Sequence, residues 1–135
     1  MENPTVRGVI ATLIGILVAG LVVALAEGAG HVIYPTPEGI DITKPEDQLR
    51  LMEIIPFGAK VAVVIAWFLG ALAGTCTARK IATVKWPAWI VTALMVAASI
   101  GTTAMFPHPT WMIACAVGLP LLALWIAGRL VPLRA

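Results

Sequence analysis

The chain has 135 residues, of which 60% are hydrophobic and 12% are charged, and its formal net charge is +2. Soluble domains contain about 25% charged residues, so this composition, with a mean hydropathy of +0.96, excludes a soluble protein and predicts an integral membrane protein. Each membrane-spanning helix needs about 20 apolar residues. We therefore expect a single all-α domain, a bundle of four transmembrane helices with one modest loop, embedded in the lipid bilayer. The charge gives no indication of nucleic-acid binding.

The first predicted span covers residues 6–33. Arg7 precedes an apolar run, as in a signal peptide, but the run is about 20 residues long and lacks a convincing cleavage site, so it is interpreted as a retained span. Gly20, Ala24 and Gly28 recur four residues apart. Because such a stripe of small residues lets two helix backbones approach closely, it predicts a helix-packing face.

Glu27 and His31 are the two ionisable residues near the end of this span. Residues four apart in a helix lie on the same side, one turn apart. Ionisable groups at membrane depth are costly unless they are paired or hydrated, and they are functional candidates by default. Two interpretations are open. In one, a basic residue neutralises Glu27 while His31 lies among the headgroups; in the other, the pair exchanges a proton or binds a cation.

The next segment leaves the helix and builds a loop. Pro35 and Pro37 cannot continue a helix. Thr43 and Glu46 have the spacing of a capping box, which predicts a short amphipathic helix over about 44–55 with Thr43 as its N-cap. Such a helix is too short to span the membrane and is expected to lie in the interface. Its apolar side consists of Leu49, Met52 and Ile55.

The second predicted span covers residues 57–77. Trp67 lies deeper than the aromatic belt of a membrane surface, so it is expected to pack against protein. Lys60 lies one turn into the helix and is the natural partner for Glu27 if the two lie at the same depth. Otherwise its long side chain can extend outward to the membrane surface. The span also carries the clearest helix-packing signal of the chain, a stripe that consists of Ala62, Ala66, Gly70, Gly74 and Ala78.

The third and fourth spans are predicted over residues 86–105 and 110–130, and the turn between them holds His108 between two prolines. Hydroxyl groups in a membrane helix usually bond back to carbonyls of their own helix. This is the expectation for Ser99, Thr102 and Thr103.

The proline and cysteine residues of the spans are expected to be structural. Pro120 should kink the fourth span, and it leaves the carbonyl of Ala116 without a helical donor. Cys76 and Cys115 fall near opposite ends of their helices and have no CxxC spacing, so no disulfide is expected between them.

Basic residues are distributed unevenly along the chain. Those on one side of a four-span arrangement are Arg7, Arg79, Lys80, Lys85, Arg129 and Arg134. Because cytoplasmic loops carry an excess of Lys and Arg, both termini are predicted to be cytoplasmic. The opposite, outer face then gathers a candidate ligand or proton site of Glu27, His31, Tyr34, Asp41, Lys60 and His108.

Many of these residues belong to a pattern that extends over nearly the whole chain. It consists of Glu27-x-x-x-His31-x-x-Tyr34-Pro35-x-Pro37-x-Gly39-x-Asp41, Pro56, Trp67-x-x-Gly70-Ala71-x-Ala73-Gly74 and Pro107-His108-Pro109-x-Trp111. The pattern resembles a family of small bacterial four-span proteins that brings no established activity. The resemblance implies a location in the bacterial inner membrane and a recurring outer-face signature, and it implies no substrate.

The residues that several known four-span proteins need are absent from this chain or lie in different places. Thiol oxidoreductases of the membrane need paired cysteines, and zinc proteases need H-E-x-x-H. Small multidrug exporters also have a carboxylate in span 1, but nearer the middle of the membrane and without an acidic outer loop. A bis-histidine haem would need His31 and His108 to face one cavity at a suitable separation.

Two function hypotheses remain. The favoured one is a non-enzymatic membrane subunit, either a homo-oligomer or part of a larger complex, in which small-residue stripes mediate assembly and the outer polar residues fix the loop. The alternative is a protein that binds or transports a proton, a metal ion or a small cation. It would use Glu27, His31 and His108, supported by Asp41 and Tyr34. No cofactor is predicted apart from this metal alternative.

Overall fold

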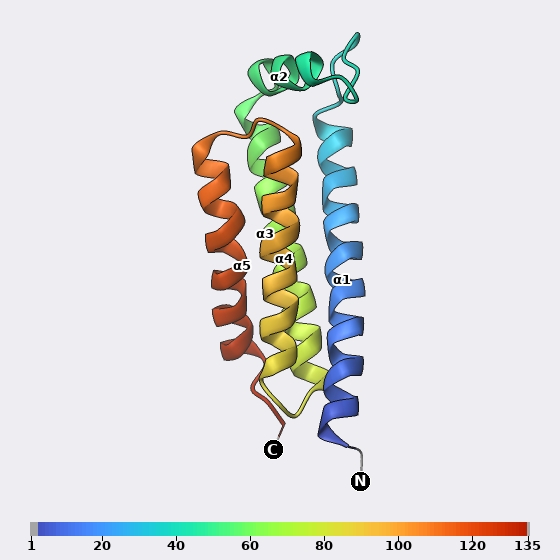
Figure 1. Cartoon of the computed structure of the whole chain (residues 1–135), viewed down its shortest axis with the longest axis vertical. Coiled ribbons are helices and arrows are strands. Elements are labelled where there is room, and N and C mark those ends of the chain that lie inside the picture. Colours follow the sequence, from blue (N-terminus) through green and yellow to red (C-terminus); the bar gives the residue numbers. More distant parts are fainter. Residues whose placement is uncertain (1–2, 135) are drawn as a thin grey trace.

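The computed structural model describes residues 3–134 as a helical bundle. In that range the chain forms α1 (Pro4–Ile33), α2 (Pro45–Ile54), α3 (Phe57–Ile81), α4 (Trp86–Met105) and α5 (Thr110–Leu130), with no strand. Four helices run side by side, and α2 lies across one end of the bundle (Figure 1). α1, α3, α4 and α5 are long and apolar enough to cross a membrane. The predicted all-α class is therefore confirmed, and the architecture fits a multi-pass membrane protein.

The two ends of the bundle differ in charge. The described part of the chain begins and ends at the same end of the bundle (Figure 1). This end, termed the basic end, carries Arg7, Arg79, Lys80, Lys85, Arg129 and Arg134. The other end, termed the acidic end, carries α2 and its flanking loops with Glu38, Asp41, Glu46, Asp47 and Glu53. The cytoplasmic location of the basic end stays a prediction from the positive-inside rule.

The spanning helices begin and end close to the predicted positions, with one extension. α3 continues to Ile81 instead of ending at residue 77. Basic side chains are favourable in the last turn of a helix, where the carbonyl ends of the peptide dipoles collect. Arg79 lies in that turn, and its Nε donates a 2.7 Å hydrogen bond to the carbonyl of Val131 beyond the end of α5.

Small residues bring α1 and α3 into backbone contact. A Cβ atom placed on Gly74 would lie 2.6 Å from the carbonyl oxygen of Gly15, and one placed on Gly70 would lie 3.0 Å from that of Ala19. These distances leave no room for a side chain. Within the predicted stripe on α3, Ala66, Gly70, Gly74 and Ala78 are buried and Ala62 is half-buried.

The predicted packing face of α1 does not contact the rest of the described bundle, and its packing against another helix stays a prediction. Gly20, Ala24 and Gly28 are all exposed, and a Cβ on either glycine would meet no other atom of the described chain within 4 Å. Successive helix positions are rotated by about 100°, so Gly20 points well away from the contact that Ala19 makes. The face that α1 uses inside the bundle consists of Gly8, Ala11, Thr12, Gly15 and Ala19.

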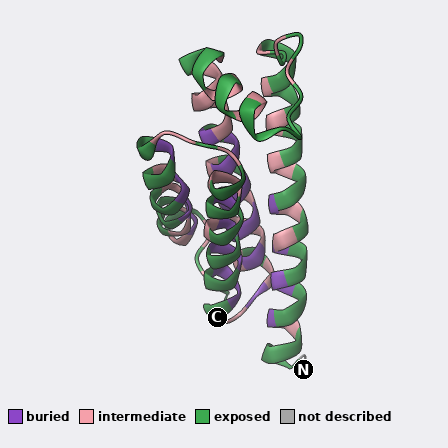
Figure 2. Cartoon of the chain, turned by 45° about the horizontal axis from the view of Figure 1, so that its top comes forward, coloured by how far each residue is buried: buried purple, intermediate pink, exposed green. Residues whose placement is uncertain are grey.

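Trp67 packs inside the bundle, as predicted. Its side chain is 3% exposed and lies in a cluster with Val64, Met112 and Ala116. Figure 2 shows the buried residues on the sides of the spanning helices that face one another, while α2 has no buried residue. The core therefore lies between the spans, and α2 remains outside it.

The hydroxyl groups of α4 follow the prediction in two cases out of three. Thr102 and Thr103 donate to the carbonyls of Ala98 and Ile100, at 3.1 and 2.7 Å. The expectation for Ser99 is wrong, because its buried Oγ has no hydrogen-bond partner among residues 3–134.

For α5 and the two cysteines, the structure is close to the expectations from the sequence. α5 continues through Pro120, whose side chain is buried. The kink at that residue stays a prediction. Cys76 and Cys115 are both free thiols in the described part of the chain, as expected.

The segment before α2 differs from the predicted capping box. Thr43 is not the N-cap: α2 begins after Lys44, which makes no side-chain capping bond. The Thr43 hydroxyl instead donates a 2.6 Å hydrogen bond to Asp41, so it is engaged before the helix starts. Gly39 turns the loop with φ of +79°, a conformation that glycine adopts without steric cost.

Candidate functional site

A cavity of about 280 Å³ lies at the acidic end, and we term it the acidic-end cavity. The last turns of α1, the first turns of α3 and the end of α4 form its walls, and α2 closes it with side chains. No Cα atom of α2 lies within 8 Å of a Cα atom in another described helix. The cavity is lined by Glu27, Gly30, His31, Tyr34, Pro35, Thr36, Ile42, Leu51, Met52, Ile55, Ala59, Ala62, Val63, Thr102, Phe106 and His108.

Four of the six residues predicted for the outer-face site line this cavity. Glu27 and His31 come from α1, Tyr34 follows it, and His108 comes from the turn between α4 and α5. These segments are far apart in sequence, and the topology brings them together because the α4–α5 turn and the end of α1 share the acidic end. The two others, Asp41 and Lys60, do not line the cavity.

Glu27 is half-buried in the cavity wall. Among residues 3–134, no side chain or backbone group donates a hydrogen bond to its carboxylate or forms an ion pair with it. The predicted pair with Lys60 is absent from this part of the chain. The positions of α3 that face the cavity are Ala59, Ala62 and Val63, and Lys60 is rotated by about 100° from Ala59 around the helix axis.

His108 is held in one orientation by its own turn. Its ring Nδ1 lies 2.9 Å from the carbonyl oxygen of Phe106. Because a carbonyl only accepts hydrogen bonds, Nδ1 carries the proton in this contact, which leaves Nε2 as an acceptor when the ring is neutral. The ring also lies 6.0 Å from that of Trp67 and 6.2 Å from that of Phe106, centroid to centroid.

Tyr34 is positioned by a glycine on the neighbouring helix. Its hydroxyl and ring lie against Gly58, where a Cβ atom would meet the hydroxyl oxygen and would lie 2.8 Å from Cζ. A larger residue at this point would displace the hydroxyl end of the tyrosine ring. Tyr34 is therefore fixed at the rim of the cavity by the first turn of α3.

Asp41 organises the loop before α2. Its Oδ1 accepts hydrogen bonds from the backbone amide and the hydroxyl of Thr43, at 3.0 and 2.6 Å. Its own amide donates to Asp47 at 2.9 Å. The hydroxyl bond and then the amide bond lower the pKa of Asp41 below its ordinary value of 3.8, because both favour the charged carboxylate.

The cavity does not form the three-residue metal site considered from the sequence. No three His, Cys, Asp or Glu side chains within residues 3–134 lie close enough together to hold one metal ion. Glu27, His31 and His108 line one cavity, but they do not form a common ligand set. The cavity that they line is largely apolar.

The sequence predicted only some of the apolar residues that line the acidic-end cavity. Met52 and Ile55 belong to the predicted apolar side of the short helix, and both line the cavity. Leu51 lines it as well, whereas Leu49 is 54% exposed. Thr102 also lines the cavity, although only a hydrogen bond within its own helix was expected for it.

No protein-family model matches the chain, and no similar chain is found among curated proteins or solved structures. The resemblance of the sequence pattern to small bacterial four-span proteins therefore stays a prediction. Conclusions about function depend on the geometry of the site.

Proposed function

We propose that the protein binds a small organic cation in the acidic-end cavity, with the carboxylate of Glu27 as its counter-ion. One observation carries this proposal. Glu27 is half-buried near the end of a membrane-spanning helix and lines a largely apolar cavity, without a cationic or hydrogen-bonding partner in residues 3–134. A carboxylate in such a place is costly unless something neutralises it.

The rest of the cavity suits the apolar part of such a ligand. Leu51, Met52, Ile55 and Val63 supply hydrocarbon walls. Tyr34 and Phe106 supply aromatic rings, whose faces attract organic ammonium groups. The volume of about 280 Å³ is just below the range of roughly 300–1,000 Å³ usual for pockets that hold drug-sized molecules, so the expected ligand is small.

The contacts also favour binding over a purely structural role for these residues. A structural latch requires the polar groups to bond with one another. Glu27 and His31 make no hydrogen bond or ion pair in the described structure, and His108 bonds to its own turn. The three residues line one cavity and form no hydrogen bond with one another.

The proposal is tested by thermal unfolding of the purified full chain in detergent with benzylammonium and with benzyl alcohol, a neutral molecule of similar size. Benzylammonium should raise Tm with increasing concentration, as expected for a ligand that binds only the folded state. Benzyl alcohol should not. The substitution Glu27→Gln should abolish the rise because it removes the counter-ion.

Glu53→Gln is the matched control, because Glu53 is exposed on α2 and does not line the cavity. This variant should keep the response to benzylammonium. An equal Tm rise in the wild type and Glu27→Gln would overturn the proposal. A rise with Zn²⁺ and none with benzylammonium would overturn it in favour of a metal ion.

The exposed stripe of Gly20, Ala24 and Gly28 favours a second candidate function, assembly with another transmembrane helix. Small residues at this spacing permit close helix association in a bilayer, and no described part of this chain covers them. The favoured hypothesis from the sequence, an oligomeric or accessory subunit, would use this face. Ala24→Leu should then abolish a dimer that chemical crosslinking detects in the wild type, and Leu25→Ala, a change at the exposed neighbouring position, should not.

A further inference from the structure

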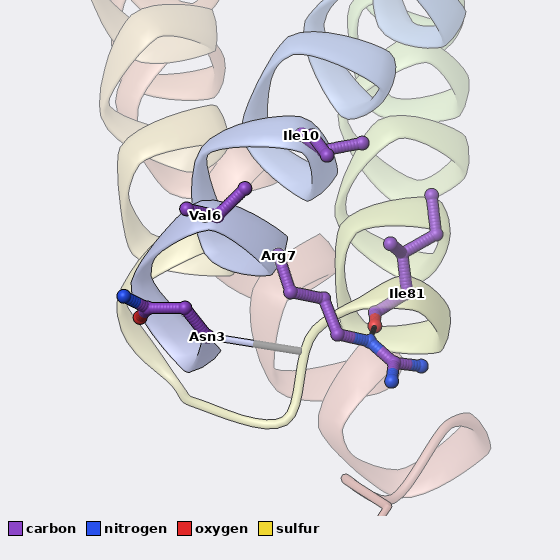
Figure 3. Close-up of a pocket in the computed structure, with 5 residues that line it drawn as sticks. All are labelled: Asn3, Val6, Arg7, Ile10 and Ile81. Carbon is purple, nitrogen blue, oxygen red and sulfur yellow. Dashed lines mark hydrogen bonds between the residues drawn. The ribbon is translucent and has the colours of Figure 1, made fainter. Parts of the chain in front are cut away.

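The two ends of the bundle differ in how their connecting segments are held. At the basic end, side chains attach the ends of the helices to one another. Arg7 of α1 donates a hydrogen bond to the carbonyl of Ile81, the last residue of α3 (Figure 3). Arg79 donates to the carbonyl of Val131 after α5. At the acidic end, the long connection from α1 to α3 includes α2 (Figure 1), and we term its residues 36–55 the flap.

The flap has no polar bond to the spanning helices. Its side-chain hydrogen bonds join residues of the flap to one another, as in the bonds of Asp41 with Thr43 and Asp47. Among residues 3–134, no hydrogen bond or ion pair joins the flap to a spanning helix. The flap can therefore move against the bundle without breaking a hydrogen bond.

Apolar side chains alone hold the flap over the acidic-end cavity. Leu51, Met52 and Ile55 are half-buried and line the cavity, and Met52 packs against the cluster that contains Trp67. α2 itself has no buried residue. Segments with few buried apolar contacts open at a small fraction of the free energy of global unfolding. The flap is therefore expected to open while the bundle stays folded.

Both ends of the flap are attached at nearly the same place. Tyr34, at the end of α1, lies with its ring against Gly58 in the first turn of α3. Ile55 and Pro56 join α2 to α3 in an extended conformation, so no continuous helix holds α2 in place. A hinge needs only a few such residues at the ends of helices. The flap can turn about this point as one unit.

The charge of the flap suits the ligand proposed for the cavity beneath it. Five of the seven Asp and Glu residues of the chain lie in the flap, together with two basic residues, Lys44 and Arg50. Charges of one sign around an opening raise the local concentration of oppositely charged ligands. The flap therefore covers the cavity with a surface that attracts cations.

We propose that the flap is a lid, which turns away from the bundle to admit a cation to the acidic-end cavity and then closes over it. This inference rests on the proposed function, because it describes access to the same cavity. In the closed position, Leu51, Met52 and Ile55 complete the apolar wall. A ligand that contacts this wall and Glu27 together binds the closed position better and shifts the lid toward it.

The test measures the distance between two spin labels by pulsed electron paramagnetic resonance of the full chain in lipid discs. The labels are attached at Glu53→Cys on α2 and Thr110→Cys at the start of α5, two exposed positions that do not line the cavity. The free thiols Cys76 and Cys115 are first replaced by alanine. Benzylammonium should narrow the distance distribution, and Glu27→Gln should abolish this narrowing.

Met52→Ala tests the contact that holds the lid. Without ligand, it should raise the open population about tenfold, as expected when a large apolar side chain loses its packing. Leu49→Ala is the matched control and should leave the distribution unchanged, because Leu49 is 54% exposed on the same helix and does not line the cavity. Leu51→Ala should open the lid in the same direction, and it replaces Met52→Ala if that variant does not fold.

The lid and the cation site can fail separately. Equal distance distributions in Met52→Ala and Leu49→Ala would overturn the lid, even if benzylammonium raises Tm. Opening in Met52→Ala that benzylammonium does not reverse, with no narrowing in the wild type, would support the lid movement and overturn the cation as its ligand.

Discussion

Helix α1 contacts the rest of the bundle in two different ways along its length. Near Gly15 and Ala19, its backbone touches that of α3, and even a single methyl group has no space at Gly70 or Gly74. Near Gly30, a Cβ atom would lie 3.6 Å from that of Ala62, an ordinary contact distance. The same helix pair is therefore closed at one point and open at another.

This difference shows how a small membrane protein can hold a cavity without a large core. The closed contact fixes the position of α1 on α3, so the last turns of α1 can stand beside a hollow without collapsing into it. The small residues of α3 act as the fixed point, while Glu27, His31 and Tyr34 are carried on the part of α1 and its exit that faces open space.

The largest effect is expected at the closed contact. Gly74→Ala should lower the free energy of unfolding by about 2 kcal/mol, because overpacking of a site with no space costs this much. The new Cβ would lie 2.6 Å from the carbonyl oxygen of Gly15. Reversible unfolding in mixed micelles measures this change.

Gly28→Ala is the matched control on the exposed face of α1. It should leave stability unchanged or raise it by about 0.5 kcal/mol, since alanine favours helix over glycine. A loss as large as that of Gly74→Ala would show that the exposed face is itself packed in the purified protein.

A smaller effect is expected at the rim of the cavity. Gly58→Ala should cost about 1 kcal/mol, because the ring of Tyr34 must shift. The atoms of Tyr34 that must move lie at the far end of a flexible side chain. The loss of unfolding free energy should therefore be smaller than for Gly74→Ala. In a double-mutant cycle, Tyr34→Phe should recover part of it. Additive losses would mean that the tyrosine hydroxyl does not contact Gly58.

A substitution at Ser99 tests whether water from the acidic-end cavity reaches further along α4. If its buried Oγ is dry as well as unpartnered, Ser99→Ala should stabilise the protein by about 1 kcal/mol, because an unsatisfied polar group is removed. Thr92→Val is the control that should give no gain, since Thr92 already donates to Ala88 at 2.9 Å. Absence of a gain in Ser99→Ala would show that water reaches Oγ from the cavity.

The smallest effect concerns the loop that leads to α2. The pKa of Asp41 is lowered by its bonds to Thr43, so these bonds favour the folded loop above the ordinary pKa of 3.8. Their contribution is lost as the pH falls through the lower pKa of the folded state. An NMR titration of the Asp41 carboxyl should show this lowered pKa in the wild type and a value nearer the ordinary one in Thr43→Ala.

The spans could be predicted because a membrane helix needs a long apolar run and little else. The face by which α1 packs could not be predicted, since Gly8, Gly15 and Ala19 are as small as Gly20, Ala24 and Gly28. Spacing indicates that a face can approach another helix closely. It does not say which partner is present, and here α3 meets only one of the two faces.

The site was partly predicted for a similar reason. Charge distribution placed Glu27, His31, Tyr34 and His108 at one end, and these residues do line one cavity. Lys60 was predicted to pair with Glu27 because of its depth in the membrane. Contact also depends on the position of a residue around the helix axis, and Lys60 is not among the α3 residues that line the cavity. The loop before α2 was misread because Asp41 binds the hydroxyl of Thr43, a competition between two local bonds that spacing alone does not resolve.

The unequal length of the spanning helices has a consequence for the cavity. α1 has 30 residues and α4 has 20, a difference of about 15 Å. A bilayer that matches α4 is therefore too thin for an upright α1, which creates hydrophobic mismatch on one side of the bundle. Val32 and Ile33, both strongly exposed, lie in the last turn of α1, at the end where the extra length of this helix extends beyond such a bilayer. Membrane thickness would then set whether Glu27 faces water or hydrocarbon.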